Sequence, residues 1–312
     1  MISIIIPFHN EEESLPILLD ELTDVLDKQS KEYEMIFIND GSTDHSMLKL
    51  KTPVRQAQGK QMSKPNLKTN NVNILSLRKR FGKGEALRVG VEKAGGEIII
   101  FMDGDLQDNP QDIPKFINKI NQGYDLVNGI RKTRKDNFII RTYSSFFNWF
   151  LRSFLKSPFT DINCGFKAIK KEVFSEIFLY GNNYRFLPLA AFYKGFNVGE
   201  IEVDNRERKY GLAKFGPGKF FIGFLDTVSA YFVYQFSEKP LHFFGSIGSV
   251  FFLIGFITAM ILSIERIFFG VLLYRRPALL FAILMIIVGI QVLMTGIIGE
   301  LIVYLSKKNS KS

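Results

Sequence analysis

Short runs of apolar residues, each followed at once by polar residues, recur along the amino-terminal part of the chain. The runs cover residues 3–7, 33–39, 72–77, 97–101, 125–130 and 197–203. Stretches with helical spacing lie between them, at residues 15–26, at 84–93 and from residue 110 onward. Unbroken apolar runs of this length are typical of strands buried on both faces. Strands that alternate with helices predict an α/β fold built on a parallel sheet.

Acidic and amide residues follow several of these predicted strands. Asn10 and Glu11 come after the first run, Asp40 after the second, and Asp103 and Asp105 after the run at 97–101. The carboxyl ends of parallel strands meet at one edge of an open sheet, and ligands bind at that edge. Asp103 and Asp105, separated by one glycine, offer hard oxygen ligands for a divalent cation. Taken alone, such a pair is as well explained by solvated turn residues.

The carboxyl-terminal part has a different pattern. Residues 241–264 contain no acid, lysine or arginine, and residues 278–304 contain only Gln291 and Glu300 as strongly polar positions. At 1.5 Å per residue the first stretch spans about 36 Å, which exceeds the thickness of a bilayer core. Two transmembrane helices are therefore predicted. Residues 215–239 are rich in glycine and aromatic residues and predict interfacial helices, with an ordinary amphipathic core helix as the alternative.

These patterns divide the chain into segments. We expect a cytoplasmic domain over 1–214 with a flexible polar insertion at 51–71, interfacial helices at 215–239, a transmembrane hairpin at 240–305 and a tail at 306–312. No secretory signal is visible at the amino terminus. The basic tail agrees with a cytoplasmic carboxyl terminus. The expected location is the cytoplasmic (inner) membrane, crossed more than once, with the large domain facing the cytoplasm.

Composition narrows the chemistry. The net charge of +9 fits an anionic partner, and nucleic acid, phospholipid and phosphorylated substrates all qualify. The single cysteine, Cys164, excludes an internal disulfide and a multi-cysteine zinc site, and it is expected to be a packed, reduced thiol. Lys83 stands between two glycines but is not part of a Walker loop, because the required Gly-x-x-x-x-Gly-Lys-Ser/Thr is absent.

Two basic segments follow the predicted sheet strands. One begins at Arg131, contains Arg141 and runs into an aromatic stretch around Trp149; the other covers residues 206–214. The first is either a solvated charged loop next to an amphipathic helix or a clamp for a phosphate near a membrane surface. Asp161 lies between them, in a compact turn that contains glycine.

The motifs taken together resemble glycosyltransferase family 2, the inverting enzymes whose GT-A fold has a Rossmann-like nucleotide-sugar-binding domain. Later motifs are similar to those of the polyprenyl-phosphate glycosyltransferases, the group that includes dolichyl-phosphate mannose synthases and their bacterial relatives. The motifs are Asp161-x-x-Cys-Gly-Phe-Lys167, Arg185-Phe-Leu-Pro188, Arg208-x-x-Gly211-x-x-Lys214, Ser237-Glu-Lys-Pro-Leu-His-Phe-Phe-Gly245 and Gly296-Ile-Ile-Gly-Glu300. The resemblance covers nearly the whole chain apart from residues 51–71.

This resemblance implies a role for each matching residue. The nucleoside would be held by Pro7, Asn10, Glu11 and Asp40, and the cation, Mg²⁺ or Mn²⁺, would be held by Asp103, Asp105 and Gln107. The acceptor phosphate would be bound by Arg131, Arg141 and Ser145. The donor diphosphate would be bound by Arg208 and Lys214. Asp161 would be a catalytic base or an acceptor-site residue, the alternative being a turn residue that caps local amides. Two departures weaken the match: Ala213 stands where the group usually has serine, and no Tyr-x-Gly-Arg follows Glu300.

The implied activity is inverting transfer of one sugar from a UDP- or GDP-sugar to undecaprenyl or dolichyl phosphate, giving a lipid-linked monosaccharide for envelope glycans. The resemblance implies no nucleic-acid partner, and it raises the hypothesis of self-association through the transmembrane helices. One alternative is a transferase acting on a glycan or lipid-linked saccharide, although the Gln-x-x-Arg-Trp of processive synthases is absent. Another is a non-catalytic membrane scaffold of the same fold.

Overall fold

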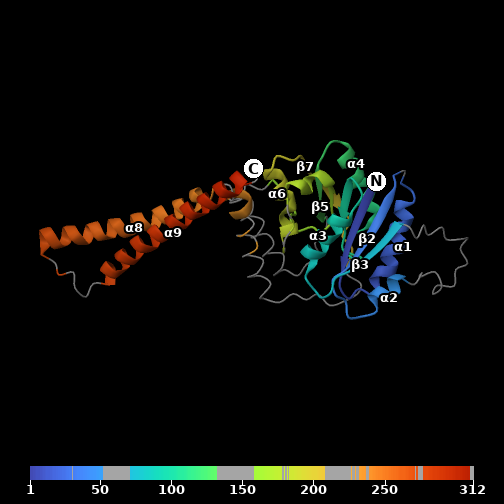
Figure 1. Ribbon diagram of the computed structural model, residues 1–312, viewed down its shortest axis with the longest axis horizontal. Helices are drawn as coiled ribbons and strands as arrows, with labels where there is room; N and C mark the ends of the chain where they lie inside the picture. The colour runs from blue at the N-terminus through green and yellow to red at the C-terminus, as the bar shows by residue number, and fades with distance from the viewer. Residues whose placement is uncertain are drawn as a thin grey trace, which may run out of the picture. The chain divides into compact units, whose positions relative to one another are not determined.

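The computed structural model describes residues 1–29, 31–51, 71–131, 158–177, 179, 181, 183–207, 226, 229, 232–236, 239–270, 272 and 277–309. The chain forms two compact units, Met1–Asp226 and Thr227–Ser312. The first contains a sheet with helices, and the second contains two long helices that lie side by side (Figure 1). The insertion expected at 51–71 lies almost wholly outside the described residues.

The first unit is built on a seven-stranded sheet with the order β3-β2-β1-β4-β6-β5-β7. The strands are β1 (Ile2–Phe8), β2 (Tyr33–Asn39), β3 (Val72–Ser76), β4 (Ile98–Phe101), β5 (Leu126–Arg131), β6 (Lys167–Lys170) and β7 (Val198–Val203). The order β3-β2-β1-β4 is parallel throughout, and β5 is parallel to β7. The α/β class and six of the strands were predicted from the apolar runs.

One strand departs from the predicted parallel arrangement: β6 is antiparallel to both of its neighbours, β4 and β5. Its sequence, Lys-Ala-Ile-Lys, is too short and too polar to show a strand pattern. The reversal has a consequence for the site. Lys167, the first residue of β6, pairs with Phe101, the last residue of β4, so the turn before β6 lies at the edge where β4 ends.

Helices pack on the sheet and form the core with it. They are α1 (Ser14–Leu26), α2 (Ser46–Lys51), α3 (Lys83–Lys93), α4 (Ile113–Asn121) and α6 (Leu187–Tyr193), with short 3-10 turns η3 (Pro110–Asp112), η4 (Lys171–Ser175) and η5 (Asn183–Phe186). Leu18 and Leu22 of α1 and Phe116 of α4 are fully buried with Ile4 and Phe37 of the sheet. The leucine spacing that predicted α1 therefore marks its buried face.

The second unit is a helical hairpin of α8 (Pro240–Phe269) and α9 (Pro277–Asn309), preceded by a π-helical turn, η6 (Phe232–Phe236). Both long helices were predicted, and both extend past the predicted ends. Of the most apolar stretch, only 17% of residues in α8 and 11% in α9 are buried, unlike a soluble core helix. The two helices are thus long and apolar enough to cross a membrane, and they leave most apolar side chains outward.

Small residues bring the two helices together. Gly248 and Gly255 of α8 and Ala282, Gly289 and Gly296 of α9 are buried at the seam. A Cβ built on Gly289 would lie 2.5 Å from the amide nitrogen of Phe252 and 2.8 Å from the carbonyl oxygen of Gly248. This close backbone approach is the packing expected where van der Waals contact, and not water exclusion, holds helices together.

Gly289→Val is expected to loosen the hairpin, because the added side chain overlaps backbone atoms that cannot move independently. Overpacking of this kind costs about 1–3 kcal/mol, which should lower the midpoint of thermal unfolding in detergent by several degrees. The matched control is Ile290→Val on the exposed neighbouring position, where Ile290 is 48% exposed. Equal unfolding midpoints for the two variants would contradict the packing described here.

Candidate functional site

Polar residues from three neighbouring strands meet at one edge of the sheet. Asn10 follows β1, Asp40 follows β2 and Asp103 follows β4. β1 lies between β2 and β4 and is parallel to both, with Phe8 opposite Asn39. The predicted gathering of these residues at a carboxyl edge is therefore seen in the structure, and ligands bind at this edge in open α/β sheets.

The loops after β1 and β2 are tied together by Asn10. Its backbone has a left-handed φ of 57°. Its Oδ1 accepts a 2.8 Å hydrogen bond from the amide of Thr43, and its Nδ2 donates to the Thr43 hydroxyl at 3.2 Å. The amide of Glu11 donates to the hydroxyl of Ser46 at 2.8 Å. These hydrogen bonds hold the loop after β1 against the loop after β2, and Pro7 lies in β1 shortly before Asn10.

Asp40 supports the loop that leads into α3. The residue is 5% exposed, and its carboxylate accepts hydrogen bonds from the amides of Phe81, at 2.7 Å, and Gly82, at 3.0 and 3.1 Å. Gly41 has a φ of +64°, and a Cβ there would lie 2.6 Å from the amide nitrogen of Arg80. Only glycine combines that backbone conformation with such close contact. The sequence predicted Asp40 at the site but not its hold on this loop.

The loop places Lys83 against the carboxylates. Lys83 is the first residue of α3, and its ammonium forms an ion pair with Oδ1 of Asp103. Burial lowers the pKa of Lys83, but the charge and hydrogen bond of Asp103 outweigh that effect and raise it above its ordinary value. Sequence reasoning missed this residue, because the two glycines around it drew attention only as a failed Walker loop.

Asp108 brings a third carboxylate to the same loop. It is 6% exposed, and its Oδ2 accepts a 3.1 Å hydrogen bond from the amide of Asp103. Burial, and then the charge of Asp103, raise the pKa of Asp108 to about 7. Asp105 lies between them, and its Oδ1 accepts from the amide of Gln107 at 3.2 Å. In the part of the chain that the structure describes, the side chains of Lys83, Asp103, Asp105 and Asp108 thus gather at this loop.

These residues fit a divalent cation that is shared with a phosphate ligand. Among the described residues, no three histidine, cysteine, aspartate or glutamate side chains are grouped to hold a metal alone. Mg²⁺ is commonly bound by one or two carboxylates, with phosphate oxygens and water in its other positions. The backbone of Gly165 lies close to the Asp103 carboxylate, since a Cβ on Gly165 would lie 2.9 Å from its Oδ2. Asp103 and Asp105 can thus supply the protein ligands.

The segment after β7 is fastened to this acidic loop. The amide of Arg206 donates to the carbonyl of Gln107 at 2.8 Å, and Asn205 forms a β-bridge with Asp108. The Arg206 guanidinium also donates to Glu21 at 2.7 and 3.0 Å. The second basic segment therefore begins beside the carboxylates. Four predicted site residues lie outside the described residues: Arg141, Ser145, Arg208 and Lys214.

Arg131 and Asp161 form a bidentate pair. Nε of Arg131 lies 2.8 Å from Oδ2 of Asp161, and Nη2 lies 3.1 Å from Oδ1. The side chain of Asp161 is 8% exposed and that of Arg131 is 25% exposed. Burial lowers the pKa of Arg131, but the hydrogen bond and charge of Asp161 raise it above its ordinary value. The carboxylate of Asp161 is thus directed at Arg131, and its turn is supported by Glu200, which accepts from the Thr160 amide at 2.9 Å.

A buried lysine holds the turn that contains Asp161. The ammonium of Lys167 donates to Oδ1 of Asn128 at 2.6 Å, to the carbonyl of Ile162 at 3.2 Å and to the carbonyl of Cys164. Burial lowers the pKa of Lys167 to about 8. Sequence analysis identified Lys167 only as a motif position, because a lysine at the end of a short strand is ordinarily exposed.

The thiol of Cys164 is buried beneath this turn, as predicted, and is 1% exposed. Burial raises its pKa to about 11 from 9.0. Because the thiolate is the reactive form, alkylation of the folded protein at pH 8 is expected to be at least about 100-fold slower than that of protein in urea. Labelling with iodoacetamide, followed by mass spectrometry, measures the ratio. Comparable rates in the two states would show that the turn opens readily.

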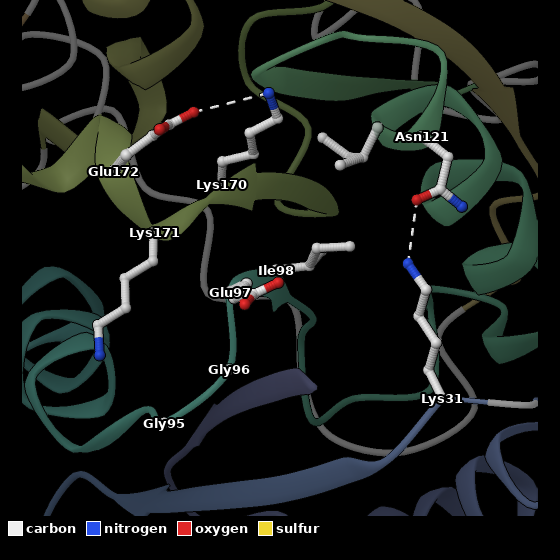
Figure 2. A pocket seen from close by; sticks show the side chains of 10 residues that line it. Lys31, Gly95, Gly96, Glu97, Ile98, Asn121, Lys170, Lys171 and Glu172 are labelled. Carbon is white, nitrogen blue, oxygen red and sulfur yellow. Dashed lines mark hydrogen bonds and ion pairs between the residues drawn. The ribbon is translucent and has the colours of Figure 1, made fainter.

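A hollow of about 410 Å³ lies at the other edge of the sheet (Figure 2). It is bordered by Ile98, the first residue of β4, whereas the carboxylates follow the last residue of that strand. Its three lysines already have partners: Lys31 donates to Asn121 at 3.0 Å, Lys170 pairs with Glu172 at 3.6 Å, and Lys171 donates to the carbonyl of Ala94 at 2.6 Å. This hollow is therefore separate from the site of the carboxylates.

The mixed sheet, with paired carboxylates at the carboxyl end of its central strand, defines the GT-A class of glycosyltransferases. The chain belongs to glycosyl transferase family 2, whose family model matches residues 3–178. It is a glycosyltransferase.

Known relatives match nearly the whole chain. It is 28% identical over 305 residues to dodecaprenyl-phosphate galacturonate synthase of Rhizobium johnstonii, covering 96% of this chain and 87% of that protein. It is 31% identical over 303 residues to undecaprenyl-phosphate 4-deoxy-4-formamido-L-arabinose transferase of Aeromonas hydrophila, covering 97% of this chain and 88% of that protein. The Proteus mirabilis enzyme of the same name is 30% identical over 96% of this chain and 88% of its own length.

Solved structures agree on the fold. Glucosyl-3-phosphoglycerate synthase of Mycobacterium tuberculosis, in complex with Mn²⁺, UDP-glucose and phosphoglyceric acid, superimposes with a TM-score of 0.55. The match covers 75% of this chain and 78% of that one at 17% sequence identity. The same enzyme in complex with UDP gives a TM-score of 0.55 at 18% identity, over 74% of this chain and 79% of that one.

Proposed function

We propose that this protein transfers one sugar from a nucleotide sugar to the phosphate of a polyprenyl phosphate, by a single displacement that inverts the anomeric carbon. The observation that carries the proposal is the extent of similarity to relatives named for polyprenyl-phosphate sugar transfer. That similarity covers 96% of this chain in one case and 97% in another, so it includes the sheet and both apolar helices.

The donor binds at the carboxyl edge of the sheet in this proposal. Pro7, Asn10, Glu11 and Asp40 border the nucleoside, and Asp40 acts in part through the loop that its carboxylate holds. Asp103 and Asp105, with Gln107 beside them, hold a divalent cation, Mg²⁺ or Mn²⁺, against the diphosphate. Support comes from the two carboxylates that follow β4 in one loop and from the Mn²⁺ and UDP-glucose in the complex of the structural neighbour.

A divalent cation held there would neutralise the charge that builds up on the departing nucleoside diphosphate. The residues of this chain do the rest. Asp103 and Asp105 determine the position at which the cation meets the diphosphate. Arg208 and Lys214 add positive charge from the segment that starts beside the acidic loop. Preorganised charge of this kind is commonly the largest contribution to group-transfer catalysis.

The acceptor phosphate needs positioning more than deprotonation. A phosphate monoester has its second pKa near about 6 and is therefore largely dianionic at neutral pH. Arg131 is proposed to bind it with Arg141 and Ser145, because a guanidinium matches phosphate oxygens in a bidentate manner. Asp161 then orients Arg131 and is not required as a base, which fits its direct contacts with the Arg131 guanidinium at 2.8 and 3.1 Å.

The membrane part completes the proposal. The hairpin of α8 and α9 crosses the inner membrane, the interfacial segment at 215–239 rests on its surface, and the domain at 1–214 faces the cytoplasm with the tail at 306–312. Support comes from the length and polarity of the two helices and from Lys307 and Lys308 in the last turn of α9. Self-association through the hairpin is a hypothesis that sizing in detergent tests.

The test is a transfer assay with membranes that contain the protein, undecaprenyl phosphate, Mg²⁺ or Mn²⁺, and a panel of radiolabelled UDP- and GDP-sugars. The expected result is label in the organic phase for one sugar, abolished by a chelator. Label on a water-soluble glycan or on a longer lipid-linked saccharide would favour the alternative enzyme, a transferase that acts on a glycan or a lipid-linked saccharide. Absence of transfer together with absence of metal-dependent nucleotide binding would favour the scaffold.

A further inference from the structure

Lys83 has no part in the roles assigned so far, yet it lies at the centre of the site. Its ammonium pairs with Asp103, the first of the two proposed metal ligands. The side chain of Lys83 is 26% exposed and that of Asp103 is 37% exposed, so the pair reaches the open edge of the sheet. A purely structural lysine in this protein looks different: Lys167 is fully buried and donates to uncharged oxygens.

The position of Lys83 is fixed from three sides. The amides of Phe81 and Gly82, which precede it, are held by the carboxylate of Asp40. Helix α3 presses on the sheet, since a Cβ on Gly90 of that helix would overlap the side chain of Ile5. The ring of Tyr184 lies 5.1 Å from the Lys83 ammonium, within the range of a cation–π contact. The ammonium is thus preorganised at the carboxylates.

A divalent cation on Asp103 would change the surroundings of this ammonium. The carboxylate charge that now stabilises Lys83 would be shared with the metal, and two cations side by side repel each other. The ligand that arrives with the metal, a nucleoside diphosphate, brings the negative charge that both require. A hollow of about 350 Å³, lined in part by Phe81, Gly82 and Glu85, opens at the start of α3.

We propose that Lys83 has two successive partners: the Asp103 carboxylate before loading, and the diphosphate of the donor once a metal occupies Asp103. This inference rests on the proposed donor site and adds a residue to it. Lys83 would compete with a metal that arrives alone and cooperate with a metal that arrives with a nucleotide. Metal binding would therefore be strong only together with the donor.

The test uses the full-length protein in detergent and the variant Lys83→Met, with Lys83→Arg as a variant that keeps the charge. The control is Lys93→Met, at an exposed position in the last turn of the same helix. Electron paramagnetic resonance of free Mn²⁺ measures binding of the metal alone. Calorimetry at saturating Mn²⁺ measures binding of UDP, GDP and inorganic pyrophosphate. Circular dichroism identifies any variant that does not fold.

For Lys83→Met we expect Mn²⁺ alone to bind about 3- to 10-fold more tightly, since a competing cation is gone. We expect the nucleoside diphosphate with Mn²⁺ to bind about 10-fold more weakly, with Lys83→Arg in between and Lys93→Met unchanged. A structural role would instead weaken both kinds of binding together. Weaker or unchanged binding of Mn²⁺ alone, or unchanged nucleotide binding, overturns the inference, as does a wild type that binds none of the three phosphate ligands.

If Lys83→Met does not fold, Lys83→Arg decides by the same two measurements. The affinity of Lys83→Arg for Mn²⁺ alone must differ from that of the wild type, because arginine pairs differently with Asp103. The affinity of Lys83→Arg for the diphosphate with Mn²⁺ must be lower than that of the wild type. None of these readouts depends on the acceptor. A protein that shows the opposed shifts but transfers no sugar to polyprenyl phosphate would retain the inference about Lys83 and lose the proposed function.

Discussion

Asp105→Ala is expected to lower sugar transfer about 1,000-fold, because removal of a metal ligand forfeits several kcal/mol of charge stabilisation. Asp105 is the better test of the two carboxylates. Asp103 pairs with Lys83, and its removal would leave that ammonium without its partner. Asp105 accepts a hydrogen bond from the Gln107 amide within its own loop, at 3.2 Å. The initial rate of label transfer into lipid measures the effect.

The matched control is Asp24→Ala, an acidic residue on the exposed side of α1, which should keep wild-type activity. Nucleotide binding separates a lost metal site from a misfolded loop. In Asp105→Ala, UDP or GDP should bind equally with and without Mn²⁺, whereas the wild type should bind more tightly with Mn²⁺. Retention of more than about a tenth of the wild-type rate would remove the metal site from the proposal.

Arg131→Ala is expected to lower kcat/KM for polyprenyl phosphate by at least about 100-fold, since a bidentate, charge-assisted phosphate contact is lost. Nucleotide binding should stay near the wild-type value. The free energy of unfolding should also fall, by about 3 kcal/mol, because the nearly buried charge of Asp161 loses its bidentate contact with Arg131. Transfer at varied acceptor concentration and thermal unfolding measure the two effects.

Asp161→Asn distinguishes orientation from base catalysis. The amide keeps the shape of the carboxylate and removes its charge. If Asp161 orients Arg131, the variant should raise KM for the acceptor and keep kcat within about tenfold; loss of a general base would cost about 100- to 10,000-fold in kcat. The control for the removal of an arginine in Arg131→Ala is Arg88→Ala. Arg88 pairs with Glu85 and Glu92 on the surface of α3, and exposed ion pairs contribute little to stability. A collapse of kcat in Asp161→Asn would restore the base.

The sequence alone determined the framework on which the site stands. Unbroken apolar runs that end in Asp40 or Asp103 can bury both faces only within a covered sheet, and parallel strands then carry those residues to one edge. The two apolar helices could also be predicted from the sequence, because a run of about 20 apolar residues is typical of a membrane-spanning helix. These features depend on local periodicity and on the hydrophobic effect, and both follow from the order of apolar and polar residues along the chain.

The tertiary structure alone decided which charged groups meet. β6 has too few apolar residues to be recognised, yet its antiparallel pairing brings the Asp161 turn to the end of β4. Arg131 meets Asp161 across 30 positions of sequence, and Lys83 meets Asp103 across 20. The reason is physical. Strand periodicity is local, whereas an ion pair between distant segments depends on strand order, register and the packing of loops, which no local pattern encodes.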